Sequence, residues 1–186
     1  MWWFRYKIFD SLSTGSTPAK GDALVNSVPK VTGDPVKDLS DTTYNATLNI
    51  VDTKEDTDFT DDFLKSYGET GTGTTREELI TEAENNPLNI ILTITKNTEG
   101  NNIVTLSKPS PASGEEPYLK DAELKKDSSG KYNAGVEKTV EYGTEVYYIE
   151  FDTTTIKYVI ASSQNFGGGD IGSKYTYTGT LTKQAN

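Results

Sequence analysis

The sequence predicts a mainly β protein, an antiparallel β-sandwich or barrel with one or two short flanking α-helices and long loops. The chain holds 27 Thr and 11 Tyr among its 186 residues, and β-branched and aromatic side chains suit the half-buried surface of a strand. Six or seven short stretches alternate in polarity with the period of two that strands show. Several short strands in one chain indicate a sandwich or a barrel.

We expect one domain over residues 1–186, because a chain of this length is long enough for one hydrophobic core. The aromatic residues 2–9 form either a further strand or an arm. Residues 10–43 contain three Pro and three Gly with almost no periodicity, which predicts a long irregular segment. The opening MWWFRYKIFD lacks the features of a signal peptide, so we expect the chain to start at its own Met1.

The first clear strand is TYNATLNI, residues 43–50, in which alternate apolar side chains share one face. Two short helices follow. In TDDFLKSYG, Thr60 is suited to cap a helix that Gly68 would end. In TREELITEAENNP, residues 75–87, Thr75 and Glu78 have the spacing of a capping box.

The remaining strands lie in the second half of the chain: LNIILTIT (residues 88–95), NIVTL (102–106), EVYYIEF (145–151), TIKYVIA (155–161) and KYTYTGTLT (174–182). KPSPASGEEP, residues 108–117, is expected to be a loop, and the stretch after it a polar hairpin that turns near Ser129 and Gly130. In the closing strand, every second residue is Thr. We expect its Tyr and Leu side chains to pack and its Thr side chains to form a small, neutral face.

The net charge of −10 is concentrated in one part of the chain. Residues 52–84 hold eleven acids against three bases, and such a surface repels phosphate. Only two Arg occur, so that bidentate phosphate clamps are scarce. The composition argues against sequence-specific nucleic-acid binding. No apolar run is long enough to cross a bilayer, and we expect no contact with a membrane.

Catalysis is not expected. The chain has no Cys and no His, which removes thiolate nucleophiles as well as the commonest general base and the commonest metal ligand. GGGDIGSK, residues 167–174, nearly matches a phosphate-binding loop, but Lys174 is displaced by one residue and a strand follows, so we interpret it as a connector between antiparallel strands. DTDFTDD, residues 56–62, lacks the Gly and Glu of a calcium-binding loop. We predict no catalytic, cofactor-binding or metal-binding residues, and leave incidental cation binding by the acidic segment open.

Two surfaces are candidates for contacts. The aromatic cluster at the start is more suited to core packing or to an interface between subunits than to a ligand shelf, because a large exposed aromatic patch is normally an interaction surface. Its residues are Trp2, Trp3, Phe4, Tyr6 and Phe9. An acidic surface is expected from Asp52, Glu55, Asp56, Asp58, Asp61 and Asp62.

The chain resembles the major tail tube proteins of long-tailed bacteriophages. The resemblance rests on TIKYVIASSQNFGGGDIGSKYTYTGTLTK, which is a strand, a Gly-rich acidic connector and a final alternating strand. The order of TYNATLNI, an acidic linker, TDDFLKSYG and NPLNIILTIT is similar to the centre of that family. The opening residues and the loop after Lys108 fit the family less well.

The resemblance implies a structural virion protein, assembled in the host cytoplasm, that contacts copies of itself and other virion proteins. Six copies would form a ring, and stacked rings a hollow tube that conducts DNA. The candidate bore-facing residues are Thr176, Thr178, Thr180 and Thr182. A binding module is the alternative function, either a capsid decoration protein or an immunoglobulin-like surface adhesin, because a strand-rich, Thr-rich chain suits it equally well.

Overall fold

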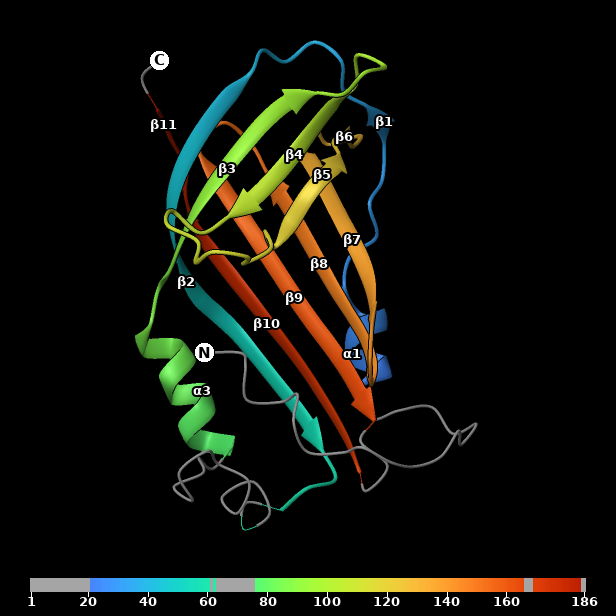
Figure 1. Cartoon of the computed structure of the whole chain (residues 1–186), viewed down its shortest axis with the longest axis vertical. Coiled ribbons are helices and arrows are strands. Elements are labelled where there is room, and N and C mark those ends of the chain that lie inside the picture. Colours follow the sequence, from blue (N-terminus) through green and yellow to red (C-terminus); the bar gives the residue numbers. More distant parts are fainter. Residues whose placement is uncertain (1–20, 61, 63–75, 166–168, 185–186) are drawn as a thin grey trace.

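The computed structural model describes residues 21–60, 62, 76–165 and 169–184. The strands in this part of the chain form one antiparallel sheet, in the order β1-β6-β7-β8-β9-β10-β2-β3-β4-β5, with β11 pairing β2 (Figure 1). The strands are β1 (Asp34–Pro35), β2 (Thr42–Thr57), β3 (Leu88–Lys96), β4 (Asn102–Ser107), β5 (Leu119–Glu123), β6 (Lys125–Lys126), β7 (Tyr132–Val140), β8 (Gly143–Phe151), β9 (Thr155–Asn165), β10 (Asp170–Thr180) and β11 (Thr182–Lys183). Helix α1 spans Asp22–Asn26 and helix α3 spans Arg76–Asn85.

The sheet curls until its ends nearly meet, so that the architecture is a nearly closed barrel. Val36 and Leu124 close the seam together with the first residue of β4. The Val36 N–H donates to the Leu124 carbonyl at 2.9 Å, and the Leu124 N–H donates to the Asn102 carbonyl at 3.0 Å. A mainly β fold with antiparallel pairing and short flanking helices is thus confirmed.

Two buried asparagines hold the segment that runs along this seam. The Asn133 amide exchanges two hydrogen bonds with the backbone of Thr32, at 2.9 and 3.0 Å. The Asn102 amide does the same with the backbone of Leu39, at 3.1 and 3.0 Å. Because a side-chain amide presents the same donor and acceptor as a peptide group, each Asn takes the place of a strand partner for an irregular segment.

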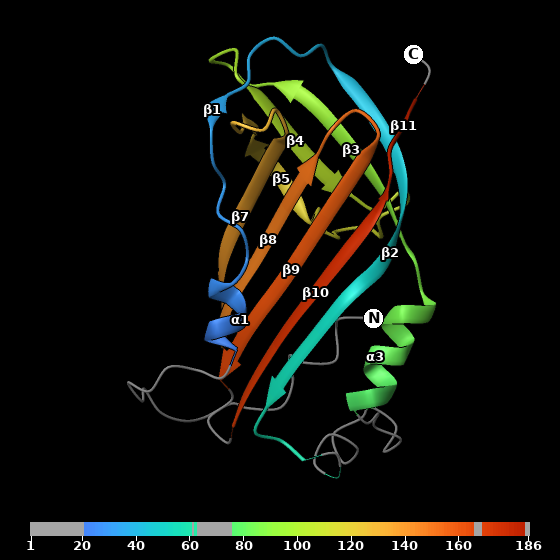
Figure 2. The ribbon, with the colours of Figure 1, turned by 180° about the vertical axis from the view of Figure 1, so that it is seen from behind.

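We expected residues 10–43 to be irregular, but the described part, residues 21–41, contains helix α1 and the short strand β1. A helix of five residues is not stable in isolation. Val25 and Val28 are buried with Tyr148, Val159 and Ala161 on the back of β8 and β9, where Figure 2 shows α1 against the sheet. Tertiary packing therefore stabilises a helix that local sequence does not predict.

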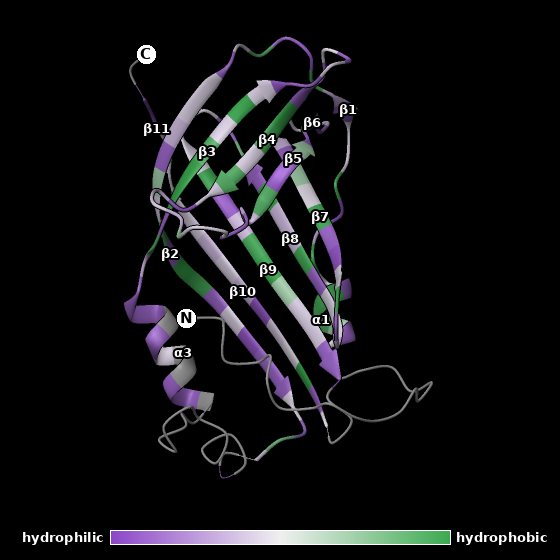
Figure 3. Ribbon diagram, viewed as in Figure 1, coloured by the Kyte–Doolittle hydropathy of each residue, from purple (hydrophilic) through white to green (hydrophobic). Residues whose placement is uncertain are grey.

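The main core lies inside the barrel and takes residues from one face of each of the strands β2 to β5 and β7 to β10. Apolar positions are spread along the strands, whereas the residues of α3 that Figure 3 colours by hydropathy are mostly hydrophilic. The predicted strands at residues 43–50, 88–95, 102–106, 145–151 and 155–161 are all confirmed, as are the hairpin near Ser129 and the helix in residues 75–87. Most of the helix expected over residues 60–68 lies outside the described residues.

Five long strands, β7, β8, β9, β10 and β2, continue past the part of the barrel that β3, β4 and β5 cover (Figure 1). We call this continuation the sheet extension; it comprises residues 134–140, 143–149, 159–165, 170–176 and 49–57. Strand β2 is longer than its apolar alternation predicts, because its acidic second half pairs with β10 from Asp52 to Thr57. Helix α3 lies beside this half of β2.

One margin of the sheet extension is β7. Strand β6 pairs only with Tyr132 and Asn133, and no other strand of the described residues pairs with residues 134–140 on the side away from β8. Val140 pairs with Gly143 across a two-residue turn, and the pair that flanks such a turn is hydrogen-bonded. Bonded and non-bonded pairs alternate, so the backbone groups of Gly135, Glu137 and Thr139 point to the open margin.

Candidate functional site

Strand β10 has the two faces that its sequence predicts. Tyr175 and Tyr177 are buried in the main core, as is Leu181 just after the strand. Thr178, Thr180 and, in β11, Thr182 are exposed. Thr176 is only 8% exposed, because it lies opposite Val159, which packs beneath α1. The candidate bore-facing strand therefore presents three of its four threonines to solvent.

Two of the exposed threonines, Thr178 and Thr180, line a shallow hollow of about 480 Å³ on the outside of the barrel, with Asn49 and Lys157 beside them. Lys131 lies at its rim, and its ammonium bonds to Glu150 at 2.7 Å. That hydrogen bond raises the pKa of Lys131. The hollow thus offers hydroxyl and amide groups together with two cations, Lys157 and Lys131, and the charge of Lys131 is offset by Glu150.

Asp152, also at the rim, forms the hydrogen bonds of a turn. The backbone N–H groups of Thr154 and Thr155 donate to its carboxylate, and so do their hydroxyls. The N–H bonds to the charged form lower the pKa of Asp152 to about 2. Asp152 therefore acts as a structural carboxylate of the β8–β9 turn.

The strand alternation of β2 divides the acidic residues between two faces. Asp52 lies with Lys54 on the outer face, which α1 and Lys174 share. Glu55 points to the inner face, where the Tyr175 hydroxyl donates to its carboxylate. Asp58 accepts a hydrogen bond from the Asp170 N–H at 3.2 Å. The acidic residues of β2 therefore do not form one continuous surface.

The other candidate residues are less completely described. Asp56 lies in β2, Asp62 is exposed, and Asp61 lies outside the described residues. Within the described part of the chain, no group of three or more acidic side chains is placed to hold a metal ion. The aromatic cluster Trp2, Trp3, Phe4, Tyr6 and Phe9 also lies outside the described residues.

Lys174, the lysine of the near match to a phosphate-binding loop, lies within β10. Strands β9 and β10, which flank the Gly-rich connector, pair antiparallel as expected. The Lys174 ammonium donates to the carbonyl and hydroxyl of Ser27, at 3.1 and 2.8 Å. Burial lowers the pKa of Lys174, and the nearby charge of Lys54 adds to the effect. Lys174 thus ties α1 to the sheet.

The inner face of the sheet extension carries a row of polar side chains that the sequence did not reveal. The strand pairing places Lys138, Glu145, Ser162, Ser173 and Glu55 level with one another on five successive strands. The Ser162 and Ser173 hydroxyls are 2.8 Å apart and buried. The alternation along each strand predicts which face each of these residues is on. That the five residues lie side by side depends on the register between the strands, which the sequence does not show.

A tyrosine cluster lies next to this row. The Tyr147 hydroxyl donates to Glu145 at 2.6 Å, and Lys138 lies over the Tyr147 ring at 5.0 Å. Tyr158 is buried and packs against Tyr118 and Tyr177, with ring centroids 5.9 Å away in each case. Burial raises the pKa of Tyr158 well above its ordinary value, which keeps this hydroxyl neutral.

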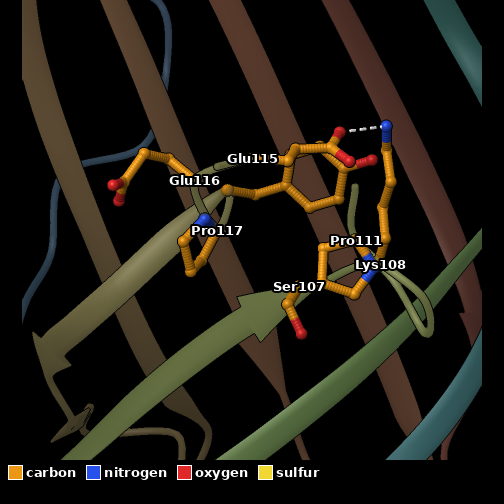
Figure 4. Close-up of a pocket in the computed structure, with 7 residues that line it drawn as sticks. Ser107, Lys108, Pro111, Glu115, Glu116 and Pro117 are labelled. Atoms are coloured by element: carbon orange, nitrogen blue, oxygen red, sulfur yellow. Dashed lines mark hydrogen bonds and ion pairs between the residues drawn. The ribbon is translucent and has the colours of Figure 1, made fainter. Parts of the chain in front are cut away.

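A second, much smaller pocket of about 30 Å³ lies where the loop after β4 folds back (Figure 4). Lys108 and Glu115 form an ion pair beside it, and their hydrogen bond lowers the pKa of Glu115. Burial raises the pKa of Tyr118, which also lines the pocket, to about 12. A volume of this size suits one water molecule and no larger ligand.

No helix of the described residues is both long and apolar enough to cross a membrane. Comparison of the chain with models of known protein families, with characterised proteins and with solved structures gives no match.

Proposed function

We propose that the chain is a structural subunit that assembles with copies of itself, as stacked rings of six that form the hollow tail tube of a virion and conduct DNA. The observation that carries the proposal is the sheet extension with its open β7 margin. An open strand edge is a template for pairing with another chain, and natural proteins normally shield it. Joining the sheets of neighbouring subunits into one closed barrel removes the edges.

The exposed threonines support the choice of a conduit. Thr178 and Thr180, with Asn49 and Lys157 beside them, give the outer face of the barrel a surface rich in hydroxyl and amide groups. Each cation that neutralises a phosphate gains affinity by releasing counterions. On this surface Lys131 is offset by Glu150 and Lys157 is the other cation, so a face made mainly of Thr and Asn would hold DNA only weakly.

The proposal sets a size for the tube. Six copies of a five-stranded extension make a barrel of about thirty strands. With neighbouring strands about 4.8 Å apart and tilted by roughly 40°, its backbone diameter is about 60 Å. That bore is wide enough for duplex DNA after side chains are added. Assembly would take place in the host cytoplasm, and other virion proteins would close the ends of the tube.

A binding module is the second candidate function, and the hollow beside Thr178 is the observation that favours it. A capsid decoration protein fits the single curled sheet. An immunoglobulin-like adhesin fits less well, because that architecture packs two separate sheets, whereas all described strands here belong to one sheet.

The test is the size and shape of the purified full chain as its concentration rises, by sedimentation and negative-stain electron microscopy. We expect rings and tubes for the wild type. Thr139→Pro removes a backbone N–H that points to the open margin, and the pyrrolidine ring of the proline blocks strand pairing there. This variant should therefore stay monomeric. Thr139→Ala keeps the N–H and should assemble. Wild-type protein that remains a folded monomer at high concentration would refute the proposal and favour the binding module.

A further inference from the structure

The sheet extension has a second margin, at the start of its β2 segment. Strand β3 pairs with β2 only from Thr42 to Leu48, and no described strand pairs with residues 49–54 on the side away from β10. Helix α3 lies beside this margin, but a helix cannot offer a strand the row of backbone partners that another strand does. Among the described residues, no strand therefore pairs with the extension along residues 49–54 on one side or along residues 135–140 on the other, and we call these two segments its open margins.

The two margins run in the same direction. Each of the pairs β7–β8, β8–β9, β9–β10 and β10–β2 is antiparallel, so the first and fifth strands are parallel. A two-fold axis pairs a strand with its own copy and makes that pair antiparallel when the axis is perpendicular to the sheet. Rotation about an axis along the strands instead brings β2 of one copy against β7 of the next, in parallel.

The side chains at the two margins are complementary. Val51 is 59% exposed, the most exposed large apolar side chain among the described residues. It lies at a bulge in β2, where the register against β10 shifts between Thr176 and Tyr177, and bulges turn a side chain away from the regular face. Val136 and Val140, on the β7 margin, are partly exposed and suit an apolar neighbour.

We infer that copies of this chain join head to tail, through parallel pairing of residues 49–54 of one copy with residues 135–140 of the next. The inference rests on the proposed assembly and names the surfaces that carry it. Such a heterologous contact repeats in one direction and does not stop at a dimer, and it closes into a ring when the rotation from one copy to the next divides a full turn. Every subunit then points the same way, and the ring has two different ends.

Cross-linking with single thiols tests this inference, because the chain contains no Cys. Val51→Cys and Glu137→Cys proteins are assembled separately and as a mixture, then treated with a short bis-maleimide. The inference predicts cross-linked dimers in the mixture alone, since equivalent thiols of neighbouring copies are separated by five strands, about 24 Å. A Thr139→Cys protein in place of Glu137→Cys moves the thiol along β7 by two residues, about 7 Å. It detects a contact in which β7 is shifted by two residues along β2.

Sedimentation of the same samples separates the two possible failures. Monomers throughout would refute the proposed assembly itself. Assemblies in which one variant alone cross-links would indicate a two-fold contact and overturn the head-to-tail inference. Assemblies in which no mixture cross-links would also overturn it while leaving the proposed function intact.

Discussion

Replacement of Asn102 gives the sharpest test of how the barrel is closed. This side chain has no solvent exposure, and its amide bonds to both backbone groups of Leu39, with a longer contact of 3.4 Å to the Thr95 carbonyl. Asn102→Ala removes two good hydrogen bonds, each worth about 1 kcal/mol, and leaves partly buried groups of Leu39 unpaired at a cost of about 1 kcal/mol more. We expect a loss of about 3 kcal/mol in the free energy of unfolding.

Urea unfolding of dilute protein, followed by circular dichroism, measures this loss. With an m-value of about 2 kcal/mol per molar urea, the midpoint should fall by about 1.5 M. Asn101→Ala is the matched control, because the adjacent Asn101 side-chain oxygen is buried without a partner and its removal should cost less. Equal midpoints for the wild type and Asn102→Ala would refute the role of this amide at the seam.

Asn102→Asp tests the same contact through pH. It places a carboxyl opposite the carbonyl oxygens of Leu39 and Thr95, where burial and the carbonyls disfavour the charged form and raise the pKa of the introduced acid. A raised folded-state pKa makes the variant relatively more stable below about pH 4 and less stable as the pH rises through the folded value. A deficit that stays constant from pH 3 to pH 7 would contradict this reasoning.

Three further predictions concern the site. The folded-state pKa of Asp152, lowered from 3.8 to about 2, contributes stability that is present above pH 4 and lost as the pH falls toward 2, so Asp152→Asn should flatten the urea midpoint over that range. Gly179→Ala places a Cβ 2.5 Å from the Thr47 carbonyl and should destabilise the fold by about 2 kcal/mol, whereas Thr180→Ala, at an exposed position, should change stability by less than about 0.5 kcal/mol in the same assay. Thr178→Lys with Thr180→Lys should make assembled tubes retain duplex DNA, with a slope of log K against log salt steeper by about 0.9 for each phosphate neutralised; an unchanged slope would place these threonines away from the bore.

Alternation in the sequence predicted the strands well, because the period of two is a local property. Tyr175, Tyr177 and Leu181 are buried as the pattern of the closing strand requires, and LNIILTIT forms β3 almost residue for residue. Thr176 differs from its neighbours in the same Thr face, because α1 packs over the adjacent Val159. No pattern within β10 indicates that contact.

The acidic segment shows a second limit of the sequence. VDTKEDT has poor strand propensity, yet it continues β2 because β10 supplies a hydrogen-bonding partner along its length. Its carboxylates are then divided between two faces, and Glu55 meets Tyr175. The expectation of one acidic surface came from charge counts, which carry no information on the direction of side chains.

The sequence by itself determined that the protein is built of antiparallel strands with packed and polar faces. Apolar and polar residues alternate along each strand, and successive side chains point to opposite faces. The tertiary structure decided which strands are adjacent, where the sheet nearly closes and where its margins stay open. These features depend on backbone hydrogen bonds between residues far apart in the chain, such as Asn102 with Val36 and β2 with β10. Every peptide group offers the same donor and acceptor, so the local sequence does not specify its partner.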